Sequence, residues 1–143
     1  MKFWDSSAIA SVLLKERLGT RLEEMLRRDE TMVTWWGTVV ECTAALARAR
    51  RGGRITVSGE GEASRELDEL SANWHEVTPW PEVRAQAQRL VRIHRLGAAD
   101  ALQLGAAIVW TGHAGEGEFV SLDDRLREAA RLEGFDVVPG KID

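Results

Sequence analysis

Four carboxylate side chains stand at four separate places in this 143-residue chain, each beside an apolar run rather than inside a charged stretch. They are Asp5, Glu41, Asp100 and Asp123. If folding gathers them, their mutual repulsion has to be offset by protons or by a cation. Hard divalent cations with oxygen ligands are the usual solution in proteins. The pattern therefore predicts a cation site, provided that the elements between the acids bring them to one point.

The apolar pattern alternates between short strand-like runs and helical stretches. The strand candidates are residues 1–5, 31–35, 74–78, 119–122 and 135–138. The helix candidates are residues 6–16, 18–28, 38–51, 62–70, 82–96, 100–110 and 124–132, with Ser6 or Ser7 as a possible cap of the first. Residues 58–62 are expected to form a surface loop and 111–118 a glycine-rich turn. This order predicts a three-layer α/β/α fold with a mainly parallel sheet of four to five strands.

The predicted elements can bring the acids together. In open parallel sheets, sites form beyond the carboxyl ends of the strands. Asp5 and Asp123 directly follow strand candidates, as this rule requires. Glu41 and Asp100 lie near the start of helices, and helix N-termini face the same edge in such a fold. We therefore expect the four acids to converge at one edge of the sheet.

Each acid also has a purely structural explanation. Glu41 fits a capping box that begins three residues earlier. Asp100 and Asp123, together with its neighbour Asp124, can complement helix dipoles. Asp5 fits a turn after a strand. One acid at each of four elements that share a sheet edge nevertheless favours a common site.

Bulk properties narrow the class of protein. The length predicts a single domain over residues 1–143, and such a chain folds without a disulfide or a structural metal. The one cysteine excludes an internal disulfide and suits a reducing cytoplasm. Asp5 interrupts any apolar leader, and no uncharged run approaches the roughly 20 residues that span a bilayer. We therefore expect a cytoplasmic protein without a membrane partner.

The formal net charge of −4 means that a nucleic-acid binder with this sequence would have to concentrate its basic residues locally. Two groups of arginines are candidates for such a surface. They are Arg48, Arg50, Arg51 and Arg54 after Glu41, and Arg84, Arg89, Arg92 and Arg95 before Asp100. Arginine suits phosphate oxygens by charge and by geometry, although solvated helix faces explain both groups as well.

Four segments of the chain together resemble a known family. Residues 3–9 form a strand that ends in Asp5 and runs through serines into a helix; residues 39–46, 96–104 and 119–126 follow in the family order. The whole chain is in this way similar to PIN-domain ribonucleases, specifically the VapC-type toxins of type II toxin–antitoxin systems. Two residues depart from the pattern. Trp4 is bulky where a small aliphatic residue is usual, and Gly105 stands inside a helix at a cost of roughly 0.5–1 kcal/mol.

The resemblance implies a PIN-like fold and hydrolysis of RNA phosphodiester bonds with Mg²⁺ or Mn²⁺. It makes all four acids, Asp5, Glu41, Asp100 and Asp123, the catalytic and metal-binding residues. Among them, Asp5, Asp100 and Asp123 are expected to be direct ligands. Glu41 would be a ligand through water or would orient the attacking water. Ser7 and Ser121 would support these acids, although helix capping and turn formation explain both serines equally well. The expected partners are an RNA substrate, a VapB-like antitoxin that covers the acidic pocket, and a second copy of the chain in a homodimer.

Several alternatives stay open at this point. Asp124 can replace Asp123 as a ligand, but Leu126 and Ala130 fit the family register only with Asp123. The number of metal ions and the identity of the RNA are undetermined. Another PIN-fold nuclease or phosphohydrolase, acting on DNA or in RNA processing, and an inactive partner-binding module also fit the chain. A receiver domain fits poorly, because Asp5 is unpaired and Lys141 lies too near the terminus, and Ser7 in place of a second acid counts against a phosphatase that forms an aspartyl-phosphate. Neither a Walker lysine motif nor a Gly-x-Ser-x-Gly elbow is present.

Overall fold

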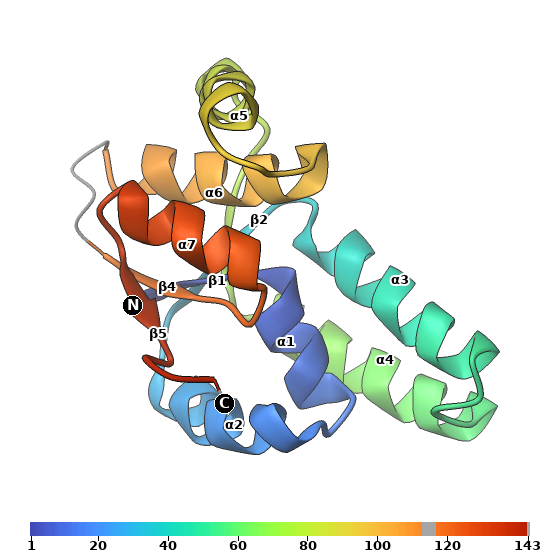
Figure 1. Ribbon diagram of the computed structural model, residues 1–143. Helices are drawn as coiled ribbons and strands as arrows, with labels where there is room; N and C mark the ends of the chain where they lie inside the picture. The colour runs from blue at the N-terminus through green and yellow to red at the C-terminus, as the bar shows by residue number, and fades with distance from the viewer. Residues whose placement is uncertain (113–116, 143) are drawn as a thin grey trace.

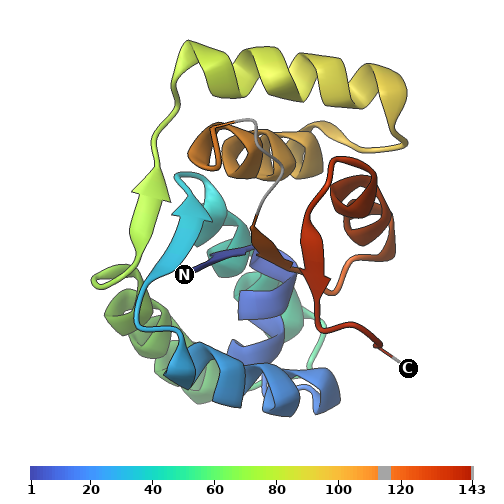
Figure 2. The ribbon, with the colours of Figure 1, turned by 90° about the vertical axis from the view of Figure 1, so that its left-hand side faces the viewer.

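One parallel sheet of five short strands lies at the centre of the computed structural model, which describes residues 1–112 and 117–142 (Figures 1 and 2). The strands run in the order β3-β2-β1-β4-β5, and every neighbouring pair is parallel. Their bounds are β1 (Lys2–Trp4), β2 (Met32–Trp35), β3 (His75–Val77), β4 (Glu118–Val120) and β5 (Asp136–Val138). The predicted mainly parallel sheet is therefore confirmed, and each strand lies within two residues of its expected bounds.

Helices cover both faces of the sheet, which confirms the three-layer α/β/α fold (Figure 1). On one side lie α5 (Pro81–Ile93), α6 (Ala98–Trp110) and α7 (Asp124–Leu132). On the other side lie α1 (Ser6–Leu13), α2 (Arg17–Arg28), α3 (Thr38–Arg51) and α4 (Val57–Ser71). None of these helices is both long and apolar enough to cross a bilayer.

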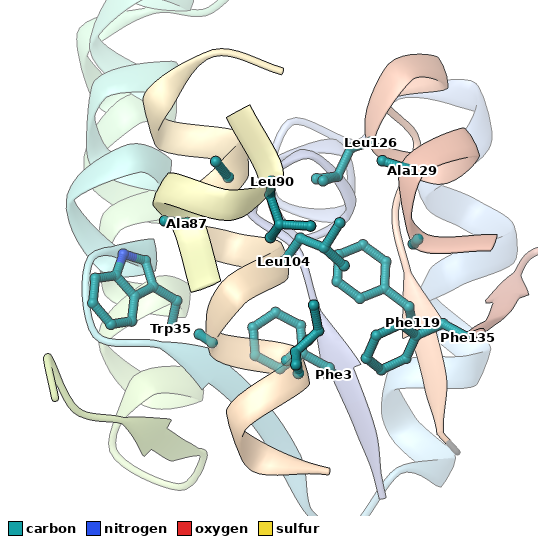
Figure 3. Packing of buried hydrophobic residues seen from close by; sticks show 14 of the residues in the cluster. Phe3, Trp35, Ala87, Leu90, Leu104, Phe119, Leu126, Ala129 and Phe135 are labelled. Carbon is teal, nitrogen blue, oxygen red and sulfur yellow. The ribbon is translucent and has the colours of Figure 1, made fainter. Parts of the chain in front are cut away.

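The strands divide their side chains between two cores because successive residues of a strand point to opposite faces. Phe3 joins the core beneath α5, α6 and α7, whereas Trp4 joins the core beneath α1 to α4. The ring of Phe3 stacks on that of Phe119, with centroids 5.4 Å apart (Figure 3). Trp4 is fully buried in its core, and its indole N–H is paired because it donates to Asp29 at 2.9 Å. Aromatic residues from the central strands therefore lie in the hydrophobic core on each face of the sheet.

The first helix is shorter than its sequence pattern suggests. α1 ends at Leu13, three residues before the expected end. Lys15 then adopts a positive φ of 53°, which a right-handed helix cannot contain. α2 begins directly afterwards at Arg17. The two expected helices are therefore present, but a tight turn at residues 14–16 replaces the last residues expected for the first one.

The expectation of a surface loop over residues 58–62 is wrong, because these residues form the first turns of α4. Two glycines suggested a loop in this segment. The hydroxyl of Thr56 caps the helix by accepting from the Gly59 amide at 2.9 Å. Buried Ala63 and Leu67 then hold the helix against the core, so tertiary packing outweighs the weak helix propensity of glycine. Part of the expected glycine-rich turn, residues 113–116, lies outside the described residues.

Gly105 has a packing reason within α6. A Cβ at this position would lie 3.0 Å from the carbonyl oxygen of Val83 and 3.2 Å from the amide nitrogen of Ala87. The backbones of α5 and α6 therefore approach each other too closely for a side chain here. This close approach explains why the helix carries glycine despite its conformational cost.

Gly19 allows a still closer contact between α1 and α2, and it generates a stability prediction. A Cβ at Gly19 would lie 2.3 Å from the carbonyl oxygen of Ser11, so the two helices would have to separate. We expect Gly19→Ala to lower the free energy of unfolding by about 1–3 kcal/mol, the usual cost of overpacking. Urea denaturation monitored by circular dichroism measures this change.

Gly61→Ala is the matched control. Gly61 also lies inside a helix, but the nearest atom to its added Cβ is the end of Arg65, 4.0 Å away. Here the better helix propensity of alanine is expected to raise the free energy of unfolding by roughly 0.5–1 kcal/mol. Equal effects of the two substitutions would show that helix propensity, rather than the α1–α2 contact, sets the value at Gly19.

Candidate active site

The four acids line one cavity of about 740 Å³ at the carboxyl edge of the sheet. Asp5 follows β1 and caps α1, whereas Asp123 follows β4 and caps α7. Glu41 and Asp100 lie in the first turns of α3 and α6. β1 and β4 are neighbours although they are far apart in sequence, and the helices after them leave on opposite faces (Figure 1). The order in which strands are added to the sheet reverses between β1 and β4. α/β proteins place their sites in the crevice that opens at such a point.

Asp5 is almost completely buried, with 1 % of its surface exposed. Its Oδ2 accepts hydrogen bonds from the hydroxyl groups of Ser7 and Ser121, the latter at 2.9 Å. The amide of Ser7 also donates to Oδ2 at 3.3 Å, which makes Asp5 the cap of α1. The expectation that Ser6 or Ser7 caps this helix is therefore wrong, because the preceding carboxylate takes that place.

The same two serines also order the loop that carries Asp123. The amide of Leu122 donates to the Ser7 hydroxyl at 3.0 Å, and the amide of Asp123 donates to the Ser121 hydroxyl at 3.1 Å. Each serine hydroxyl therefore connects the Asp5 carboxylate with the backbone after β4. This arrangement places both serines beside the acids, where they join two segments of the cavity wall.

Ser6 is a polar residue of the cavity that the sequence reasoning did not select. Its hydroxyl donates to Glu41 Oε2 at 2.7 Å and lies 3.4 Å from Asp5 Oδ1. The position directly after Asp5 was the available signal. The capping-box explanation for Glu41 is not what the structure shows: α3 starts after Gly37, which has no side chain for capping, and the Glu41 carboxylate is held by Ser6 instead.

A buried hydrogen bond joins the two helices that carry Glu41 and Asp100. The side-chain amide of Gln103 donates to the hydroxyl of Thr38 at 3.0 Å, and both residues are fully buried. Thr38 lies three residues before Glu41, and Gln103 lies three residues after Asp100. The sequence reasoning missed this pair, although Gln103 is the one polar side chain in the apolar stretch 101–110. The pair holds the first turns of α3 and α6 in a fixed relation.

A buried arginine supports the other side of the cavity. Arg127 in α7 is 2 % exposed and donates to the carbonyl oxygen of Ser121 at 2.6 Å. It also donates to the carbonyl oxygens of Pro139 and Gly140 after β5. Burial, followed by the positive charge of Arg131, lowers the pKa of this guanidinium. Arg127 thereby ties the ends of β4 and β5 together behind Ser121.

Asp123 and Asp124 are separated by their positions. Asp123 lines the cavity, and its Oδ1 accepts from the Leu126 amide at 2.9 Å as the cap of α7. Asp124 is exposed in the first turn of the helix and does not line this cavity. The geometry therefore favours Asp123 as the member of the acid group, while showing that it also serves the structural role of a cap.

The acids influence one another electrostatically. Burial raises the pKa of Asp5 to about 6; the hydroxyls of Ser7 and Ser121 oppose this rise, whereas the charges of Asp100 and Glu41 add to it. Burial, followed by the charges of Asp123 and Glu41, also raises the pKa of Asp100. Cys42 lies behind these acids, and burial raises the pKa of its thiol to about 12, so it is not a thiolate ligand.

The donor set fits a hard divalent cation, since it consists of carboxylate oxygens that destabilise one another without a counter-charge. Within residues 1–112 and 117–142, however, no three acidic, histidine or cysteine side chains already form a group close enough to hold a metal ion. The chemistry and the location fit a cation, while a closed coordination shell would require the side chains to draw together.

Comparison with known proteins agrees with this geometry. The PIN domain family model matches residues 2–132. Two curated proteins of Mycobacterium tuberculosis, Ribonuclease VapC45 (strain CDC 1551 / Oshkosh) and Ribonuclease VapC49 (strain H37Rv), are each 28% identical over 141 residues. In both cases the match covers 99% of this chain and 96% of the relative. The similarity to VapC-type ribonucleases that the sequence motifs suggest is thus confirmed.

A solved structure shows the same fold. The crystal structure of PAE2754 from Pyrobaculum aerophilum aligns with a TM-score of 0.66 and 18% sequence identity, covering 96% of this chain and 88% of the other. This likeness supports the fold, and the family-model match extends over nearly all of its elements. The chain therefore belongs to the PIN domain family.

Proposed function

We propose that this protein is a divalent-metal-dependent endoribonuclease that acts as the toxin of a toxin–antitoxin pair. The observation that carries the proposal is the meeting of four acids, from four separate elements, around one cavity at the sheet edge. Relatives that are named ribonucleases match over nearly the full length of the chain, which supports RNA as the substrate. The burial of Asp5 within this group supports a need for a counter-charge.

Mg²⁺ or Mn²⁺ is the proposed cofactor, with Asp5, Asp100 and Asp123 as its ligands. When bound, such an ion lowers the pKa of a water molecule and offsets negative charge on a phosphate. Ser7 and Ser121 hold the Asp5 carboxylate with Oδ2 fixed, which leaves Oδ1 with only the 3.4 Å contact to Ser6 among the residues that the structure describes. Glu41, held by Ser6, is suited to orient a water molecule at the cavity wall.

Two partners belong to the proposal. A VapB-like antitoxin would cover the acidic pocket, because a basic side chain can neutralise the same carboxylates as a cation. A homodimer is proposed from the family resemblance. The cytoplasm is the proposed location, as the use of cysteine suggests.

Another PIN-fold nuclease function, on DNA or in RNA processing, is the second candidate. An inactive partner-binding module is disfavoured because all four acids are present and line the same cavity. Incubation of the purified protein with single-stranded RNA and with DNA of matched sequence, with Mg²⁺ or Mn²⁺ and with a chelator, separates these possibilities. We expect cleavage of RNA in the presence of the ion.

Asp100→Asn tests the role of the acid group. Loss of a residue that merely supports a metal ligand typically lowers activity about 10–100-fold, so loss of a ligand is expected to lower kcat/KM for RNA by more than about 100-fold. The measurement is cleavage of a fluorescently labelled oligoribonucleotide with Mg²⁺. Growth inhibition on expression should disappear in parallel.

Asp136→Asn is the control for this substitution, since it removes the same charge from an exposed position at the start of β5, outside the cavity. We expect it to retain activity within about threefold of the unsubstituted protein, as a distant surface charge matters little at physiological salt. An equal loss of activity in both variants would show that the effect of Asp100→Asn does not depend on its position in the cavity.

The raised pKa of Asp5 predicts how pH affects stability when a chelator is present. The folded protein binds the Asp5 proton more tightly than the unfolded chain does. The stability that the protonated Asp5 side chain contributes is therefore lost as pH rises from 3.8 to about 6. This shift corresponds to about 3 kcal/mol. Asp5→Asn, which keeps a helix cap, is expected to remove this part of the pH dependence. Urea denaturation of both proteins between pH 4 and pH 7.5 measures the difference.

Addition of Mg²⁺ at pH 7.5 completes this comparison. An ion that binds only the folded state stabilises it by mass action. We expect stabilisation of the unsubstituted protein and little or none of Asp5→Asn. Equal stabilisation of both would show that the ion binds elsewhere, while the absence of any effect would count against a cation at these acids.

A further inference from the structure

The acidic cavity continues along α3 to a basic end. Glu41, Ala44, Ala45 and Arg48 all line it, and their spacing of three to four residues places them on one face of the helix. At a rise of 1.5 Å per residue, Arg48 lies about 10 Å along the helix from Glu41. Arg54, just beyond the end of α3, lines the same cavity. The hollow therefore has four carboxylates at one end and two guanidinium groups at the other, where the carboxylate of Glu16 also lines it beside Arg54.

The structure separates the four arginines of this segment into two pairs. The side chain of Arg48 makes no hydrogen bond or ion pair with any residue among 1–112 and 117–142, and the side chain of Arg54 makes a single long contact of 3.7 Å with Glu16. Arg50 is instead held by Glu60 through two contacts of 2.9 and 3.0 Å. Arg51 is exposed and does not line the cavity.

The ion pair between Arg54 and Glu16 is weak, so the guanidinium of Arg54 remains available to another anion. The side chains of Arg54 and Glu16 are 61% and 45% exposed. Exposed ion pairs of this kind contribute little free energy, so a ligand with stronger negative charge can replace the carboxylate. Arg48 and Arg54 together therefore offer planar donors that are available to an anion inside the cavity.

We propose that Arg48 and Arg54 form a binding subsite for a backbone phosphate of the RNA, distinct from the phosphate that lies at the acids. This inference rests on the proposed ribonuclease function. A guanidinium binds a phosphate through two parallel hydrogen bonds. A strand that lies along α3 places one phosphate beside the carboxylates and another at the arginines, because both ends belong to one cavity.

The walls between the two ends favour recognition of the backbone over recognition of bases. They are formed by Ala10 of α1, by Leu14 just after it, and by Ala44, Ala45 and Ala49 of α3. Alanine and leucine side chains have neither the hydrogen-bonding groups that read base edges nor the aromatic faces on which bases stack. The subsite therefore increases affinity for RNA without selecting a sequence, and it positions the strand across the acids.

The test compares Arg48→Ala, Arg54→Ala and the double variant with Arg51→Ala, which removes the same charge from a neighbouring exposed position. Circular dichroism verifies that each variant is folded. For cleavage of a single-stranded oligoribonucleotide with Mg²⁺, we expect KM to rise about tenfold in each cavity variant with kcat nearly unchanged, and Arg51→Ala to stay within twofold. The slope of log affinity against log salt concentration should fall by about 0.7 in the double variant, as expected for one lost phosphate contact.

Oligoribonucleotides with one neutral methylphosphonate locate the phosphate. We expect one position, away from the cleaved bond, at which neutralisation weakens binding to the protein that keeps Arg48 and Arg54 but not to the double variant. Binding is measured by fluorescence anisotropy with Asp100→Asn introduced into both proteins, so that cleavage does not interfere. No such position, or equal KM values for Arg48→Ala and Arg51→Ala, would overturn the subsite.

The outcomes separate this inference from the function on which it rests. A protein that cuts no RNA, but whose RNA affinity depends on Arg48 and Arg54, retains the subsite and loses the proposed activity. A protein that cuts RNA with no dependence on these arginines retains the activity and loses the subsite. Loss of affinity for an acidic peptide such as polyglutamate, with RNA binding unchanged, would assign the arginines to a protein partner and overturn the proposal.

Discussion

The burial of the Asp5 carboxylate is the constraint on which the site depends. This group lies at the end of the central strand β1, where it is removed from water and close to other negative charges. Hydrogen bonds from Ser7 and Ser121 stabilise its ionised form and join it to the loop after β4. Burial and the neighbouring negative charges nevertheless disfavour the ionised form of Asp5. A nearby cation or a proton therefore stabilises this carboxylate in the folded protein. The same group therefore links the stability of the fold to the chemistry of the cavity.

The scaffold around the acids keeps their backbones in place while the carboxylates repel one another. Gln103 and Thr38 connect the two helices that carry Asp100 and Glu41, and Arg127 ties the ends of β4 and β5 together. These contacts are buried, and a buried polar group that loses its partner costs about 1–3 kcal/mol. A frame of this kind would allow the side chains alone to adjust to the proposed ion, without movement of the elements.

The cavity also combines two opposite requirements for binding a polyanion. Carboxylates suited to a cation repel phosphate on their own, so attraction has to come from the ion and from separate basic groups. The arrangement of α3 meets this requirement, with Glu41 at its start and Arg48 two turns later on the same face. A net charge of −4 is thus compatible with an RNA substrate, because the basic groups are concentrated at one end of the hollow.

The sequence by itself was sufficient to predict the layered parallel fold and the edge at which the acids meet. Apolar strands that end in Asp5 and Asp123 carry this information locally, and α3 and α7 have the bounds that the sequence pattern predicts. The sequence pattern failed for residues 58–62, since packing of Ala63 and Leu67 determines whether two glycines interrupt a helix.

Tertiary structure alone decided which polar groups act together. Two hydrogen bonds join residues that are distant in sequence, namely Ser6 to Glu41 and Gln103 to Thr38. The position of Arg48 in the same cavity as the acids likewise depends on how distant segments pack. Local patterns specify the type of an element and the face that it buries, but they do not specify which side chains of two different elements come within hydrogen-bonding distance. That choice depends on how closely the helices pack, which small residues such as Gly19 and Gly105 set through the space they leave.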